Sequence, residues 1–266
     1  MSSTSSTPTS ADPVILTSID DKGVGRIILN RPHAMNAVTV ELAQELHRAL
    51  MDIAPRARVI VLSGSNGNFS VGGDFHELER LRAQGVDAMA ELFDSFRAAC
   101  KEIERLPIPV IAAVEGYAMA GGFELMQASD FAVVHENCKL ADTHTNHGQI
   151  PGGGGSQLLP RLVGRQCASA HILTGDRLTA QDAVSWGLAY KSFSTADFED
   201  QVTALACKLA SKNPAALAKS KRLIRDGLTM TFDEGLEMER TMVLNHLASG
   251  DAGQGIEAFT GKGSQS

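Results

Sequence analysis

The sequence predicts an α/β protein with a largely parallel sheet, followed by an all-helical C-terminal region. Up to about residue 200, short apolar segments rich in β-branched residues alternate with segments of helical spacing, the order expected for parallel strands joined by crossover helices. Beyond that point only helical spacing remains. The 266 residues are 43% hydrophobic and 21% charged, which is ordinary for a globular protein with a sizeable core.

The N-terminal part begins with a predicted hairpin. Residues 13–20 and 25–30 are apolar or alternating and flank a turn rich in Asp and Gly. Residues 39–53 have apolar side chains at helical spacing, and Thr39 is suited to cap that helix. Residues 58–63 form a short β-branched run that ends in glycine, which indicates a buried strand.

The middle of the chain continues the same alternation. Residues 77–106 have helical spacing interrupted near Gly85, and two prolines end this segment. Residues 110–114 read as a buried strand that leads into a helix reaching about Ser129. Another strand is predicted over residues 131–135, so the order again favours parallel pairing.

The C-terminal part is predicted to be helical, apart from a strand over residues 189–193. The predicted helices cover residues 157–163, 165–173, 179–186, 197–211, 214–227, 232–248 and 251–259. We therefore expect a Ser/Thr-rich disordered tail over residues 1–11, an α/β core over residues 12–200 and a helical region over residues 201–266.

Composition excludes several classes of protein. A net charge of −7 is unfavourable for a nucleic-acid surface. The four cysteines are widely separated, so neither a disulfide framework nor a zinc site is expected, and a reducing compartment fits best. No apolar run approaches the roughly 18 residues that a membrane helix needs, and the tail lacks the apolar segment of a signal peptide. We expect a cytoplasmic protein without metal or redox cofactor.

Two glycine-containing segments have the character of an anion-binding site. Residues 68–74 read Asn-Phe-Ser-Val-Gly-Gly-Asp, and residues 115–125 run from a strand into a helix that opens at Gly121 and Gly122. The N–H groups at the start of a helix are unpaired and can stabilise a developing oxyanion. Glu124 lies one turn inside this helix among apolar neighbours, which predicts a raised pKa suited to proton transfer.

Four motifs in one order resemble those of the crotonase (enoyl-CoA hydratase/isomerase) superfamily. They occupy residues 29–37, 69–74, 116–125 and 148–155, and the likeness runs from about residue 14 to residue 259. The resemblance implies a spiral of ββα units whose C-terminal helices pack against neighbouring subunits in a homotrimer or a hexamer. It also implies an acyl-CoA thioester substrate, so that coenzyme A enters with the substrate and not as a resident cofactor.

The resemblance assigns roles to particular residues. It implies that the backbone N–H groups of Val71 and Gly121 hold the thioester oxygen and that Glu124 is the general acid or base. It makes the glycine run before Gln157 a turn under the acyl chain. The residues that it places along the substrate and coenzyme A are Arg31, Ala34, Ala37, Asn68, Ser70, Gly72, Asp74, Gly122, Pro151 and Gly152.

The chain departs from the hydratase pattern at His144. Hydratases of this family carry a second glutamate at this place, seven residues before the proline of the glycine run, here Pro151. An imidazole can still exchange a proton near neutral pH, so His144 remains a catalytic candidate. In an extended segment Asp142 would face the same side and could orient it.

Several functions stay open on these residues. Hydration of a 2-enoyl-CoA thioester is expected first and double-bond isomerisation second; decarboxylation and thioester hydrolysis are further possibilities. A protein that binds acyl-CoA or acts as a scaffold without turnover is the alternative from another class, and an RNA-binding relative is disfavoured by charge. The glycine run lacks the Lys-Ser/Thr ending of a nucleotide-binding P-loop. Trp186 is expected to serve packing and not substrate stacking. His76 and Glu77 follow the first glycine segment and are expected to begin a helix, with a role in the acyl pocket as the alternative.

Overall fold

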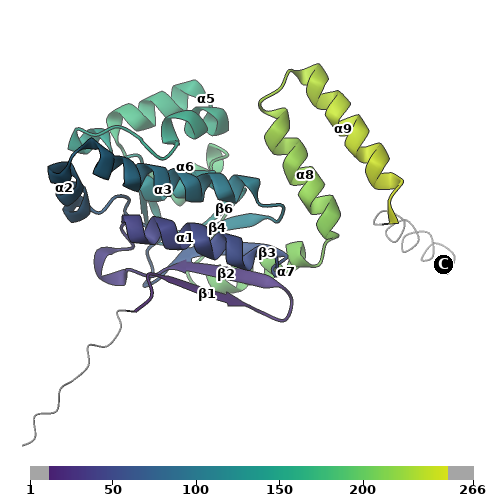
Figure 1. Cartoon of the computed structure of the whole chain (residues 1–266), viewed down its shortest axis with the longest axis horizontal. Helices are drawn as coiled ribbons and strands as arrows, with labels where there is room; N and C mark the ends of the chain where they lie inside the picture. Colours follow the sequence, from purple (N-terminus) through teal and green to yellow (C-terminus); the bar gives the residue numbers. More distant parts are fainter. Residues whose placement is uncertain (1–11, 251–266) are drawn as a thin grey trace, which may run out of the picture.

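The computed structural model describes residues 12–250, and a six-stranded sheet forms its centre (Figure 1). The strands are β1 (Ile15–Ile19), β2 (Val24–Leu29), β3 (Val59–Gly64), β4 (Val110–Val114), β6 (Phe131–His135) and β9 (Lys191–Phe193), in the order β1-β2-β3-β4-β6-β9. The hairpin pair β1–β2 is antiparallel and every other pair is parallel. The predicted fold class is confirmed.

A second sheet was not predicted. It contains β5 (Tyr117–Met119), β7 (Lys139–Ala141) and β8 (Leu178–Thr179) in the order β5-β7-β8. The expectation that the chain passes directly from strand β4 into a helix was therefore wrong, because β5 intervenes. Segments of two or three residues are too short to show an alternating pattern, which is why they escaped prediction.

The helices occupy nearly the expected positions. They are α1 (Val40–Ile53), α2 (Phe75–Gln84), α3 (Val86–Arg105), α4 (Gly121–Ala128), α5 (Gly155–Thr174), α6 (Ala180–Ser185), α7 (Phe198–Ala210), α8 (Pro214–Gly227) and α9 (Phe232–Leu247), with two short 3-10 helices, η1 (Pro32–Ala34) and η2 (Thr145–His147). The Thr39 hydroxyl accepts the N–H of Leu42 and caps α1 as expected. The predicted tail 1–11 and helix 251–259 lie outside the described residues.

Two helices have their course set by a glycine. Gly85, at φ 106°, separates α2 from α3, which confirms the predicted interruption. Gly164, at φ 79° and ψ 157°, is non-helical inside α5 and divides it into two segments. An L side chain is strained at such positive φ values, so both breaks favour glycine.

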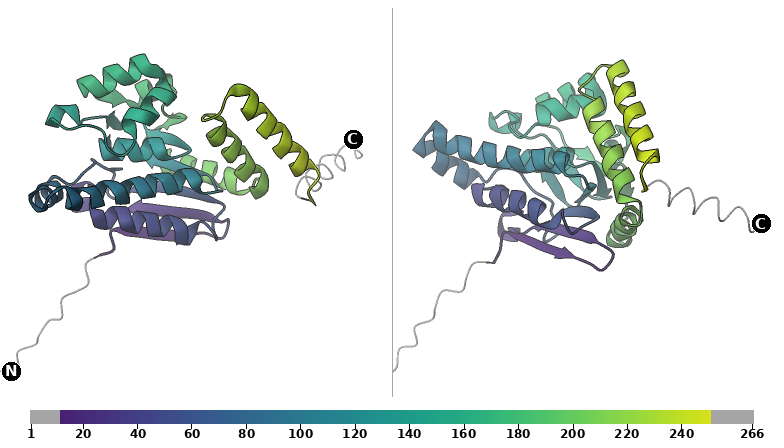
Figure 2. Two further views of the ribbon diagram at one scale, coloured as in Figure 1. Left: turned by 45° about the horizontal axis from the view of Figure 1, so that its top comes forward. Right: turned by 45° about the vertical axis from the view of Figure 1, so that its right-hand side comes forward.

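Alternate residues of the large sheet serve two hydrophobic cores. Ile60 and Leu62 of β3 face α1 and α3, which lie side by side on one face of the sheet (Figure 2), whereas Val59 and Val61 face α7 on the other. The strands therefore read as continuous apolar runs, as expected when both faces are covered.

Helices α8 and α9 form a hairpin beside the rest of the molecule and do not cover a face of the sheet (Figure 1). Lys221 of α8 ties the hairpin to the centre: its Nζ lies 2.8 Å from the Asp130 carboxylate and donates to the carbonyl oxygens of Ile103 and Ile108. Large apolar side chains stay exposed on the hairpin, namely Ile224, Leu228, Phe232, Leu236, Val243, Leu244 and Leu247. No helix within residues 12–250 is long and apolar enough to cross a lipid bilayer.

Candidate active site

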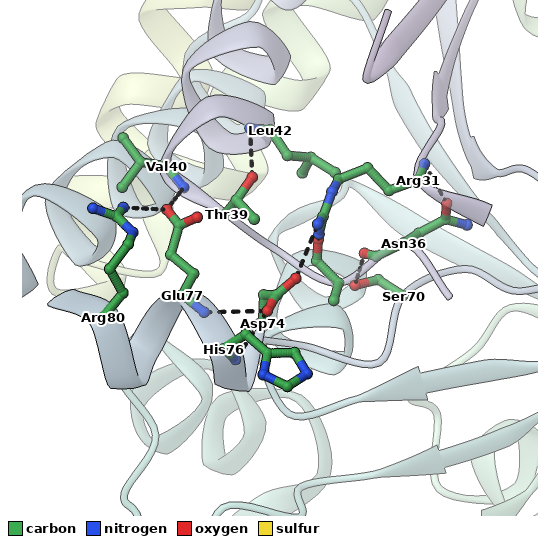
Figure 3. Close-up of polar contacts among 11 residues, drawn as sticks. Arg31, Asn36, Thr39, Val40, Leu42, Ser70, Asp74, His76, Glu77 and Arg80 are labelled. Atoms are coloured by element: carbon green, nitrogen blue, oxygen red, sulfur yellow. Dashed lines mark hydrogen bonds and ion pairs between the residues drawn. The ribbon is translucent and has the colours of Figure 1, made fainter. Parts of the chain in front are cut away.

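The loop before α1 is fastened to the first glycine segment by Asn36. Asn36 is fully buried at φ 58°, and its Nδ2 donates to the carbonyl oxygens of Ser65 and Asn68 at 3.0 and 2.7 Å. Its Oδ1 accepts the Arg31 N–H, and its own carbonyl accepts the Ser70 hydroxyl (Figure 3). One side chain therefore fixes the path of both segments.

Arg31 and Asp74 bind each other. The Arg31 guanidinium donates to the Asp74 carboxylate at 2.9 Å and to the Ala37 carbonyl at 2.6 Å (Figure 3). Asp74 also caps α2 by accepting the N–H groups of His76 and Glu77. Burial favours the neutral acid, but the Arg31 hydrogen bond and charge outweigh it and lower the pKa of Asp74. Both side chains thus hold the loops together, and their contact with coenzyme A stays a prediction.

Among the described residues, the first glycine segment has a free amide at Gly73 and a paired amide at Val71. The Val71 N–H donates to the Met35 carbonyl at 3.2 Å, whereas the Gly73 N–H makes no hydrogen bond within the described chain. A Cβ built on Gly72 would lie 2.9 Å from the Gly121 nitrogen, so the two glycine segments touch here. The amide expected as a donor at Val71 is thus already paired, whereas the amide two residues on is free within residues 12–250, and the donor role itself stays a prediction.

The second donor segment opens α4. Gly121 is the first residue of this helix, and its N–H has no partner among residues 12–250. A Cβ on Gly122 would lie 2.2 Å from the Ser70 carbonyl oxygen, so this position requires glycine. Gly122 thus allows the start of α4 to pack closely against the backbone of Ser70.

Glu124 is buried with one carboxylate oxygen fixed. It is 2% exposed, and its Oε1 accepts the N–H groups of Gly153 and Gly155 at 2.9 and 2.8 Å. Burial raises the pKa of Glu124 above its usual value, although these two hydrogen bonds and the nearby His144 oppose the rise. The glycine run therefore binds the carboxylate through two N–H groups. Helix α5 begins within this run at Gly155, two residues earlier than the expected Gln157.

His144 and Asp142 form the expected pair by a different route. His144 is the residue before η2 and has helical angles, φ −56° and ψ −47°, so the segment is not extended as predicted. The backbone instead turns around Asp142, whose Oδ1 lies 2.6 Å from His144 Nδ1 and accepts the His144 backbone N–H at 3.3 Å. Burial favours neutral imidazole, but the hydrogen bond and charge of Asp142 outweigh it and raise the pKa of His144.

One cavity joins these groups. Its volume is about 330 Å³, and its walls include Val71, Gly73, Gly121, Glu124 and His144. The remaining walls are mostly apolar and are formed by Val38, Phe75, Leu78, Met89, Leu92, Phe93, Phe96, Ala120, Thr143, His147, Gln149, Ile150 and Gly153. The α2 and α3 side chains among them were not predicted; the apolar face of residues 77–106 was the available signal.

Other predicted residues lie behind or beside the cavity. Its walls do not include Arg31, Ala34, Ala37, Asn68, Ser70, Gly72, Asp74, Gly122, Pro151 or Gly152. Glu77 accepts the Val40 N–H at the start of α1, and Trp186 packs edge-on against His171, so the packing role expected for Trp186 is confirmed. A larger cavity of about 1110 Å³ lies between the end of α3 and the α8–α9 hairpin and contains none of the predicted site residues.

The motifs, the fold and this cavity agree with the comparisons with known proteins. Residues 20–266 match the family model described as enoyl-CoA hydratase/isomerase. The chain therefore belongs to the enoyl-CoA hydratase/isomerase family, whose members act on acyl-CoA thioesters.

Individual relatives support the same assignment. The chain is 36% identical over 241 residues to the mitochondrial enoyl-CoA hydratase of Pongo abelii, covering 90% of this chain and 81% of that protein. It is 34% identical to a carnitinyl-CoA dehydratase of Salmonella agona, covering 89% and 91%. The crystal structure of an enoyl-CoA hydratase from Polaromonas sp. JS666 superimposes with a TM-score of 0.90 at 31% identity, covering 93% and 97%.

Proposed function

We propose that the protein hydrates the double bond of a 2-enoyl-CoA thioester, with Glu124 and His144 as the acid–base pair. The observation that carries this proposal is the 4.0 Å separation between Glu124 Oε2 and His144 Nε2 in the wall of one cavity. Because hydrogen bonds to water oxygen are roughly 2.8 Å long, one water can contact both groups. His144 would then replace the second carboxylate of a hydratase.

The charges of the pair suit a division of labour. Glu124 as a carboxylate takes a proton from the water, and the water oxygen bonds to the β-carbon of the substrate. The electron pair of the double bond moves toward the thioester oxygen, giving an enolate. His144, held as imidazolium beside Asp142, then gives its Nε2 proton to the α-carbon. Transfer of a proton from Glu124 to His144 restores the starting state.

The enolate oxygen would be held by the free N–H groups of Gly73 and Gly121. Both residues line the cavity, and neither amide has a competing acceptor in the described chain. Preorganised backbone donors of this kind contribute about 3–4 kcal/mol each to the transition state. Substrate binding at Val71 would instead need release of the Met35 carbonyl.

The acyl group is proposed to be apolar. Phe75, Leu78 and Met89 line the wall together with Leu92, Phe93 and Phe96, which gives the cavity an alkyl- or aryl-binding surface. Phe96 is 4% exposed and lies against Gly153, so its ring limits the depth of the cavity.

Isomerisation is the second candidate. The same 4.0 Å separation allows Glu124 to remove a proton from one carbon and return it to another, with His144 as a reservoir. Decarboxylation, thioester hydrolysis and acyl-CoA binding without turnover are the remaining alternatives.

The reaction can be assigned with a panel of enoyl-CoA thioesters in deuterated water, read by mass spectrometry. Gain of one full water is the expected result. Deuterium uptake with a moved double bond would assign an isomerase, and loss of carbon dioxide or of coenzyme A would assign a decarboxylase or a hydrolase. Thioester binding without any product would support the scaffold alternative and overturn the proposal.

The α8–α9 hairpin is proposed to assemble the protein as a homotrimer or a hexamer. Its exposed apolar residues, including Phe232 at 80% and Leu228 at 74% exposure, are the support for this proposal. Light scattering during size-exclusion chromatography should give a mass of three or six chains. A monomeric mass at micromolar concentration would contradict it.

A further inference from the structure

His171, in the second segment of α5, is a buried polar group that the proposed reaction does not use directly. It is 2% exposed, and its ring packs against Phe123 and Trp186, with centroids 5.2 and 6.1 Å away. A histidine surrounded by aromatic rings has little water available, so each hydrogen bond that it makes is structurally significant.

The hydrogen bond of His171 reaches the pair at the active site. Its Nε2 accepts the backbone N–H of Asp142 at 3.1 Å. Only an unprotonated nitrogen can accept, so the ring must be neutral and carry its hydrogen on Nδ1. Burial lowers the pKa of His171, despite the charges of Asp142 and Asp176, and so favours the same neutral form.

Asp142 directly follows strand β7, and its side chain bonds only to His144 among the described residues. Its side chain is fully buried, Oδ1 is bound to His144, and Oδ2 has no hydrogen-bond partner within the described residues. The position of its carboxylate is therefore set by its backbone, and the nearest side chain that holds this backbone is His171.

We propose that His171 is a positioning residue, which fixes Asp142 and through it the orientation and charge of His144. The chain of contacts runs from His171 Nε2 to the Asp142 N–H, from Asp142 Oδ1 to His144 Nδ1, and from His144 Nε2 toward Glu124 Oε2. The catalytic consequence rests on the proposed function, whereas the effect on His144 is a property of the protein alone.

Two substitutions separate the hydrogen bond from the packing. His171→Phe keeps a ring between Phe123 and Trp186 but removes the acceptor. His171→Gln places an amide oxygen near the position of Nε2 and can accept the Asp142 N–H again. His135→Phe is a matched control, because His135 also accepts a backbone N–H, that of Asn137, and stacks on Phe198 away from the cavity.

The first measurement is the titration of His144 by NMR, with the signal assigned from a His144 variant. The groups that face His144 are Asp142 and Glu124. In His171→Phe the pKa of His144 should fall, because Asp142 no longer holds the imidazolium, and His171→Gln should restore it. An unchanged His144 titration in folded His171→Phe overturns the proposal, whether or not the protein hydrates any thioester.

The second measurement is turnover, if the wild-type protein is a hydratase. His171→Phe should lower kcat by about 10- to 100-fold, as expected for a misplaced catalytic group, with little change in KM. His171→Gln should recover most of this loss and His135→Phe should keep wild-type kcat. Wild-type kcat in His171→Phe together with a loss in His171→Gln would assign His171 to packing alone and overturn the proposal.

Discussion

The carboxylate of Glu124 and the imidazole of His144 face each other across 4.0 Å, although they come from separate elements. Helix α5 bonds to Glu124 itself and to Asp142, the residue that holds His144. Its first residue, Gly155, donates to Glu124, and His171 near its end accepts from Asp142. The separation of the two groups is therefore maintained through one helix.

Substitution of Glu124 by glutamine should abolish most of the activity without unfolding the protein. The amide oxygen can still accept the N–H groups of Gly153 and Gly155, but the side chain can no longer take a proton. We expect kcat to fall by about 10²- to 10⁴-fold, with thioester affinity retained. Steady-state hydration rates and calorimetric binding test this, and a wild-type rate would remove Glu124 from the mechanism.

Removal of the imidazole should also slow turnover. His144→Ala is expected to lower kcat by at least about tenfold, because the proton donor to the α-carbon is lost. His135→Ala, at a histidine outside the cavity walls, provides the control and should retain wild-type kcat. Equal rates for both variants would exclude His144 as a proton carrier.

Asp142→Asn should shift the pH profile of kcat/KM to lower pH. Asp142 raises the pKa of His144, so its loss lowers that pKa. His144 acts as imidazolium, so activity is lost as pH rises through its pKa, and the alkaline limb should move down. Asp142 also raises the pKa of Glu124, which must be ionised, so the acid limb should move down as well. An alkaline limb that stays in place would contradict the assignment of His144.

Gly72→Ala should disrupt the donor pair. Gly72 has φ +89°, and a Cβ there would lie 2.8 Å from the Ala120 Cβ and 2.9 Å from the Gly121 nitrogen. We expect kcat/KM to fall by at least about 10²-fold, as for loss of one oxyanion donor. Gly187→Ala is matched for backbone strain, with φ +73° and open space around it.

Both glycine variants should lose about 1–2 kcal/mol of unfolding free energy from left-handed strain, but only Gly72→Ala should lose activity. Urea unfolding and hydration kinetics on the same samples separate the two effects. Comparable activity of the two variants would show that the contact between the glycine segments is dispensable.

Lys221→Met should destabilise the junction between the α8–α9 hairpin and the centre. The Lys221 side chain is 9% exposed and pairs with Asp130, whose pKa is raised by burial against the opposing charge of Lys221. The Asp130 side chain is 23% exposed, so its charge stays partly solvated when Lys221 is removed, and we expect a loss of about 1–3 kcal/mol. Lys208→Met, at an exposed position on α7, is the control in urea unfolding. Equal unfolding free energies would contradict a stabilising junction.

The sequence predicts the large sheet well because its strands are continuous apolar runs. Residues 110–114 and 131–135 match β4 and β6 residue for residue. The position of Glu124 one turn inside α4 was also predictable, because a helix that starts at the glycine pair fixes the spacing between Gly121 and Glu124. In each case the pattern is local and the structure confirms the element.

The features that escaped prediction depend on tertiary contacts. The Val71 N–H is paired with the carbonyl of Met35, a residue with left-handed backbone angles that its side chain does not predict. His171 lies 29 residues after Asp142 in a segment of helical spacing, where an isolated histidine carries no specific signal. The hydrogen bonds from the Gly153 and Gly155 N–H groups to Glu124 likewise join segments that are distant in the chain.

The non-helical residue Gly164 gives this arrangement an unusual geometry. It divides α5 into a first segment whose Gly155 donates to Glu124 and a second segment that carries His171, and a Cβ built on Gly164 would meet no atom within 4 Å. Glu124 and the backbone of Asp142 are thus bonded by two segments of one interrupted helix that contains neither the acid nor the base.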